Sequence, residues 1–107
     1  MGRTSSSIKL AALRKFSRQP VLLKAQLTTG SYEFDCIAYD LSLTGIMLKL
    51  DLPLATDCEV HVMVRENPPL PARVVWADDG YIGLEFRPAP DQVAKILGSI
   101  GGKLPRT

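Results

Sequence analysis

Alternation of apolar and polar residues is the main pattern between residues 20 and 88. In one run, Val60, Val62 and Val64 alternate with His61, Met63 and Arg65. This spacing places the three valines on one face of an extended segment. Clusters of Gly, Pro, Asp and Asn separate such runs. The pattern predicts six strands, over residues 21–27, 32–39, 46–50, 60–65, 70–77 and 81–87. Six short strands at this spacing are typical of an antiparallel barrel or sandwich.

The last third of the chain contains a strong turn and a helical stripe. Asp78-Asp79-Gly80 predicts a hairpin turn, because Asp and Gly tolerate positive φ. After Pro90, apolar residues recur at helical spacing, which predicts a helix over about 91–100 with Asp91 as its cap or first-turn acid. The stripe consists of Val93, Ile96, Leu97 and Ile100. This helix is expected to pack on the barrel or to close one of its ends.

Charge is distributed unevenly along the 107 residues, a length that fits one domain. The net charge is +2, but residues 1–32 carry six bases and no acid (+6), and residues 33–107 carry seven bases and eleven acids (−4). A basic leading segment on a mildly acidic body indicates an anionic partner near the N-terminus. A solvated, disordered tail is the alternative interpretation.

Several function classes lack the residues that they need. His61 is the single histidine and lies mid-strand, so no base stands beside a nucleophile, and no GxGxxG or Walker pattern occurs. His61 and the two cysteines, Cys36 and Cys58, have no metal-site spacing. The chain is therefore expected to be no enzyme and to hold no metal or cofactor. Reduced thiols and the lack of an apolar run of about 20 residues favour a cytoplasmic protein with no membrane insertion.

Two short motifs suggest chemistry. Residues 14–18 place Arg14 and Arg18 four positions apart, just before the first strand. An arginine presents a planar fork that binds phosphate or the O6/N7 edge of guanine. Residues 40–45, Asp-Leu-Ser-Leu-Thr-Gly, join the second and third strands. Ordinary turn chemistry explains them, with Asp and Ser bonding to the backbone and Gly45 supplying positive φ, but Asp40 can also accept from guanine N–H groups.

Together these motifs resemble the PilZ family. The order is RxxxR, one hairpin, DxSxxG and a short strand, and Arg73-Val-Val-Trp76 and Tyr81-Ile-Gly-Leu-Glu-Phe86 are similar to the last two strands of that family. The resemblance implies an all-β fold: a six-stranded antiparallel β-barrel with a C-terminal α-helix. It places the domain over 13–100, with the barrel over about 20–88. We expect a disordered, flexible basic arm at 1–12 and a disordered tail at 101–107.

The resemblance also implies a ligand, cyclic di-GMP. Arg14 and Arg18 would grip its phosphates and the Hoogsteen edge of guanine. Asp40 and Ser42 would contact the other side of guanine or a phosphate, and Gly45 would let the backbone approach. Three further residues are weaker candidates for ligand contact. They are Leu13, Lys15 and Trp76, of which Trp76 is also interpreted as a core aromatic of the fifth strand.

The implied function is that of a monomeric receptor in bacterial second-messenger signalling. Ligand binding would order the arm and create a surface for an effector protein in trans that controls motility, polysaccharide or biofilm. One alternative is a PilZ-fold adaptor that binds protein and no nucleotide. A small nucleic-acid-binding barrel is a second alternative, but an exposed aromatic face is missing from the pattern, so no DNA or RNA partner is expected.

Overall fold

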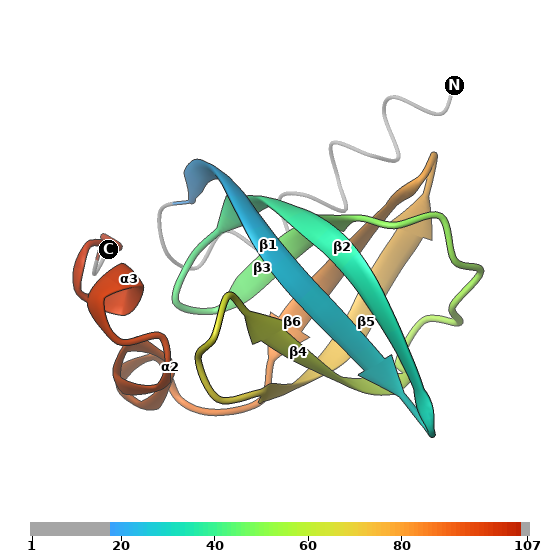
Figure 1. The fold of residues 1–107 in the computed structure, drawn as a ribbon. Helices are drawn as coiled ribbons and strands as arrows, with labels where there is room; N and C mark the ends of the chain where they lie inside the picture. The colour runs from blue at the N-terminus through green and yellow to red at the C-terminus, as the bar shows by residue number, and fades with distance from the viewer. Residues whose placement is uncertain (1–17, 106–107) are drawn as a thin grey trace.

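Six strands form a closed barrel in which every neighbouring pair is antiparallel (Figure 1). The computed structural model of the chain describes residues 18–105. Around the barrel the strands follow the order β1-β2-β3-β6-β5-β4. Their bounds are β1 Gln19–Thr29, β2 Tyr32–Leu41, β3 Gly45–Lys49, β4 Glu59–Val64, β5 Leu70–Asp78 and β6 Tyr81–Phe86. The predicted fold class is confirmed.

The strands differ from the predicted ones mainly at their ends. Strand β1 begins at Gln19, and β2 continues to Leu41, because these two ends pair with each other as neighbouring strands. Asp40 therefore lies in a strand. The sequence had suggested that it belongs to the following turn. The predicted hairpin turn is present, with φ of 58° at Asp79 and 82° at Gly80.

Inward-facing side chains fill the barrel. Alternate residues of β5 and β6, such as Val74, Ile82 and Leu84, are fully buried, and their neighbours in sequence face outward. Irregular pairing interrupts the alternation in three places: between Pro20 and Leu23 in β1, between Ala38 and Asp40 in β2, and between Val74 and Trp76 in β5. A bulge of this kind changes the direction of the side chains that follow it.

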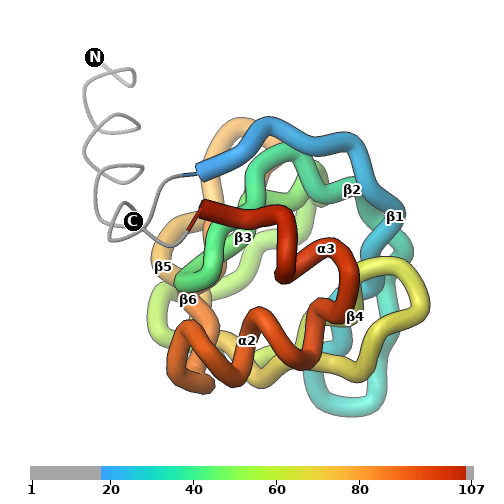
Figure 2. The backbone as a smooth tube through the Cα atoms, turned by 90° about the vertical axis from the view of Figure 1, so that its left-hand side faces the viewer, coloured from blue at the N-terminus to red at the C-terminus, as the bar shows by residue number. Residues whose placement is uncertain are grey.

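The predicted C-terminal helix is in fact two short helices, α2 Pro90–Ile96 and α3 Ser99–Gly102. Gly98 separates them with φ of 61°, a conformation that continues no helix. Asp91 lies in the first turn of α2, whose N-cap is Ala89. Both helices lie over one end of the barrel (Figure 2), where Val93 and Leu97 join the core.

The chain beyond residue 100 also differs from the expected disordered tail. Leu104 is buried in the core cluster, and Gly101 packs closely against the backbone of Ala94. Residues 106 and 107 lie outside the described residues, as does the arm at 1–12. Within residues 18–105, no helix has the length and apolar character that crossing a membrane requires.

The two cysteines are free and differ in burial. Burial raises the pKa of the Cys36 thiol to about 11, and the neighbouring charge of Asp35 adds to the shift. Because the folded state favours the protonated thiol, its contribution to stability is present below pH 9 and is lost between about pH 9 and 11.

At pH 8 we expect Cys36 to react with a thiol reagent far more slowly than partly exposed Cys58. With its pKa raised to about 11, the Cys36 thiol has a thiolate fraction roughly 100-fold below that of an ordinary cysteine. The kinetics of Ellman's reagent should therefore show two phases, and the Cys58→Ser variant should retain only the slow one. One fast phase for both thiols would contradict the burial of Cys36.

Candidate functional site

Four residues from four adjacent strands form a row on the outer side of the barrel. The pairing joins β2 to β3, β3 to β6 and β6 to β5 at successive positions. The adjacent row of paired residues points inward and is fully or almost fully buried. Since neighbouring side chains in a strand point to opposite faces, the first row faces outward. Its members are Asp40, Met47, Gly83 and Trp76.

The first member of this row holds an arginine of the RxxxR motif. Nη2 of Arg18 donates to Oδ2 of Asp40 at 2.6 Å, across 22 residues of sequence. The arginine side chain is 11% exposed and the carboxylate 26%, so both remain in contact with solvent while they pair. The structure thus joins one residue from each predicted motif. Leu13, Arg14 and Lys15 lie outside the described residues.

Ser42 and Gly45 shape the turn that follows Asp40. The hydroxyl of Ser42, in a residue that is only 1% exposed, accepts from the backbone N–H groups of Thr44 and Gly45, each at 3.1 Å. This is the turn chemistry that the sequence suggested. Gly45 is different from expectation, because it has no positive φ and instead opens β3 opposite Glu85. A direct contact of Ser42 or Gly45 with a ligand stays a prediction.

Trp76 lies at the other end of the row, on the outer face. Its indole covers Gly83 so closely that a Cβ on that glycine would stand 2.1 Å from Nε1. Only 7% of Trp76 is exposed, yet the residue is outside the hydrophobic core cluster. Its Nε1 is buried without a hydrogen-bond partner among the described residues. The interpretation of Trp76 as a core aromatic is confirmed for its burial, although its indole packs on Gly83 and lies apart from the hydrophobic core cluster.

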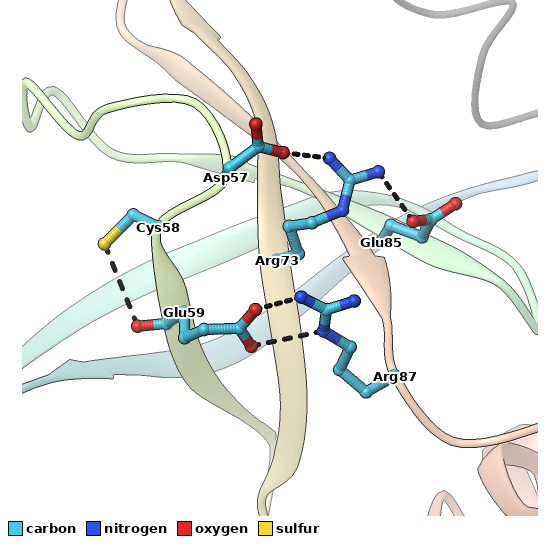
Figure 3. A network of polar contacts seen from close by, with 6 residues as sticks. All are labelled: Asp57, Cys58, Glu59, Arg73, Glu85 and Arg87. Carbon is cyan, nitrogen blue, oxygen red and sulfur yellow. Dashed lines mark hydrogen bonds and ion pairs between the residues drawn. The ribbon is translucent and has the colours of Figure 1, made fainter.

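A second polar cluster borders the site, and sequence reasoning missed it (Figure 3). Arg73 donates to Asp57 at 2.5 Å and to Glu85 at 2.7 Å, and Arg87 pairs with Glu59. The hydrogen bond with Glu85, followed by that with Asp57, raises the pKa of Arg73 above its usual value. The hydrogen bond from Arg87 lowers the pKa of Glu59.

This cluster matters for the site through one acid. Glu85 is paired across the strands with Gly45, beside the Ser42 turn. Its negative charge would repel an anion bound there, but the guanidinium of Arg73 neutralises it. The sequence gives one signal for this arrangement: Arg73 and Glu85 both point outward if their two strands are paired correctly as a hairpin.

The family model of the PilZ domain matches residues 12–100. The chain belongs to the PilZ family. This match covers both motifs and every strand and confirms the resemblance noted from the sequence. PilZ domains are regulatory, ligand-binding domains. A comparison with curated proteins gave no match.

Solved structures of PilZ proteins share the fold. The PilZ domain of CeSA from a cellulose-synthesizing bacterium is 22% identical with a TM-score of 0.65, over 77% of this chain and 96% of that one. The Bacillus subtilis inhibitor of motility (MotI/DgrA) is 21% identical with a TM-score of 0.63, over 81% of this chain and 49% of that one. PlzA of Borreliella burgdorferi, solved in complex with c-di-GMP, is 15% identical with a TM-score of 0.50, over 100% of this chain and 60% of that one. This chain thus spans about half of MotI and three-fifths of PlzA.

Proposed function

We propose that this PilZ protein is a receptor for cyclic di-GMP, which binds on the outer face of the barrel along the row from Asp40 to Trp76. The observation that carries the proposal is the pairing of Arg18 with Asp40, since it brings the two family motifs to one place. The PilZ protein PlzA was solved in complex with c-di-GMP, which supports the choice of ligand.

The chemistry of the row suits a guanine dinucleotide. The guanidinium of Arg18 is a planar fork of five N–H donors, a geometry that suits a phosphate or the O6/N7 edge of guanine. The carboxylate of Asp40 accepts two or more hydrogen bonds, which suits guanine N1–H and N2–H. Arg14 would supply the second fork of the motif, and Lys15 and Leu13 would lie beside the ligand.

The size of the row also suits one dinucleotide. Asp40 and Trp76 are three strand spacings apart, or roughly 14 Å at about 4.8 Å per spacing. That length accommodates a guanine held at Asp40 and a second base stacked near the indole of Trp76. Ser42 and Gly45 would act at the turn beside Asp40, where Ser42 already holds the backbone in place.

Signalling would follow from the arm. The ligand is a dianion, and residues 1–32 carry a charge of +6. Bound between Arg14, Arg18 and the barrel, it would order the arm and so form a new surface for an effector protein in trans. The monomeric, cytoplasmic protein would in this way control motility, polysaccharide or biofilm.

Calorimetric titration of cyclic di-GMP into the purified protein tests this function. We expect saturable binding in the low-micromolar range, about −8 kcal/mol, because several charge-assisted hydrogen bonds are offset by the ordering of the arm. Cyclic di-AMP is the matched control, since it has the same charge and backbone but lacks the N1–H and N2–H donors that Asp40 accepts.

Either outcome of the titration is informative. Binding of cyclic di-GMP with at least tenfold weaker binding of cyclic di-AMP would support recognition of guanine at Asp40. No heat and no rise in melting temperature at high ligand concentration would overturn the proposal. In that case the alternative of a protein-binding adaptor with an intact motif would take its place.

A further inference from the structure

The first half of β1 is paired with a strand on one side only. Strand β4 pairs with residues 25–28 of β1, and its last residue, Val64, lies opposite Ala25. Residues 19–23 extend beyond this point (Figure 1), so they have β2 on one side and no strand of residues 18–105 on the other. An extended segment of another chain can lie along an open edge of this kind.

The turn after β4 leaves this edge open. Arg65 has φ of 56°, in the left-handed region that residues with a side chain rarely adopt. Its backbone N–H donates to the C=O of Lys24 at 2.8 Å, beyond the last paired residue of β4. Glycine adopts this conformation without strain, so the backbone of the turn does not require an arginine. The arginine instead adds a positive charge to the edge.

An exposed leucine lies on the same edge, beside a cavity. Leu22 is 71% exposed, although the residues on either side of it, Val21 and Leu23, pack against the core. The cavity has a volume of about 410 Å³, and its wall consists of Leu22, Leu23, Lys24, Arg65 and Glu66. An apolar side chain of a partner can be buried there against the two leucines.

The charged side chains of the cavity wall select the partner. Lys24 and Arg65 form no ion pair within the described residues, and Glu66 supplies the only negative charge of the wall. A lysine on an edge disfavours any strand that leaves its charge uncompensated, whereas a carboxylate beside both cations is favourable. A second copy of this chain would bring the same two cations to one edge twice, and their repulsion disfavours it.

We propose that the edge formed by Leu22, Lys24 and Arg65 binds an extended segment of a partner protein that carries an apolar side chain next to acidic ones. The apolar side chain lies in the cavity against Leu22 and Leu23, and an acid lies beside Lys24 and Arg65. This contact suits the effector of the proposed function. It is built from residues outside the row from Asp40 to Trp76, so it does not depend on cyclic di-GMP.

Titration of the full chain with a designed peptide, followed by NMR without cyclic di-GMP, tests this surface. The probe is a soluble peptide of about ten residues, the length of a long strand, in which leucine and threonine alternate with glutamate. We expect saturable shift changes at residues 20–24 and 64–67. The same peptide with lysine in place of each glutamate should bind at least tenfold more weakly.

Two variants separate the apolar and the charged part of the contact. Leu22→Ser should weaken binding of the acidic peptide about 5- to 10-fold. Its matched control is Tyr32→Ser, which removes an equally exposed apolar residue (68%) from β2 and should change nothing. Arg65→Gly should weaken binding about 3- to 10-fold at an unchanged melting temperature, because glycine fits φ of 56°.

The outcomes against the proposal are distinct. Absence of saturable changes at residues 20–24 and 64–67, or equal binding of the lysine peptide, would overturn it. Dimerisation of the chain that Leu22→Ser abolishes would also overturn it, in favour of a contact between two copies. A chain that binds cyclic di-GMP but not the acidic peptide keeps the receptor function alone, and a chain that binds only the peptide keeps this surface alone.

Discussion

Arg18→Ala is expected to weaken binding of cyclic di-GMP by roughly 100-fold or more, with little change in the stability of the fold. Hydrogen bonds to charged groups are worth about 1.5–3 kcal/mol each, and the guanidinium is expected to make at least two of them with the ligand. Each 1.4 kcal/mol is a factor of ten in affinity. The loss also leaves Asp40 without the guanidinium that neutralises it beside a dianion.

The calorimetric measurement separates this role from a general effect of charge. Lys24→Ala removes the same charge from an exposed position of β1, and we expect it to change the affinity less than threefold. Arg18→Lys keeps the charge and loses the fork, so its affinity should lie between the two. Arg14→Ala should resemble Arg18→Ala if both arginines grip the ligand. An Arg18→Ala variant that binds as Lys24→Ala does would refute the assignment of Arg18.

Local patterns predicted the barrel well because they report backbone geometry. The alternation around Val60, Val62 and Val64 indicates a half-buried strand, and residues 78–80 form the turn that their φ preferences require. What local patterns miss is the place where strands are irregular. The shift between Val74 and Trp76 turns the tryptophan outward, although its alternation with Ala72 and Val74 indicates a core position.

The candidate site, too, was predicted only in part from local sequence patterns. The two motifs are readable in the sequence, but only the pairing of β1 with β2 shows that Arg18 and Asp40 meet. The Arg73 cluster depends on the register of β4, β5 and β6, which no spacing in the sequence encodes. The apolar stripe alone does not show that the helix breaks at Gly98, because a glycine within such a stripe can also continue a helix at a cost of about 1 kcal/mol.

Gly83 is the residue on which the position of Trp76 depends. A Cβ at position 83 would stand 2.1 Å from Nε1, 2.4 Å from Cε2 and 2.8 Å from Cδ1 of the indole, so the ring of Trp76 must move. We expect Gly83→Ala to destabilise the protein by about 1–3 kcal/mol and to weaken cyclic di-GMP binding about tenfold or more. Urea unfolding and calorimetry measure the two effects.

A matched variant and a suppressor make the Gly83 prediction specific. Gly102→Ala adds the same methyl group where nothing lies within 4 Å, and it should leave stability and affinity almost unchanged. All three close atoms belong to the five-membered ring, so Gly83→Ala combined with Trp76→Phe should regain part of the lost stability. Emission from Trp76, the only tryptophan, should shift to longer wavelength in Gly83→Ala as the ring meets water. Unchanged emission and affinity would mean that the outer face tolerates a displaced ring, and that Trp76 has no part in the site.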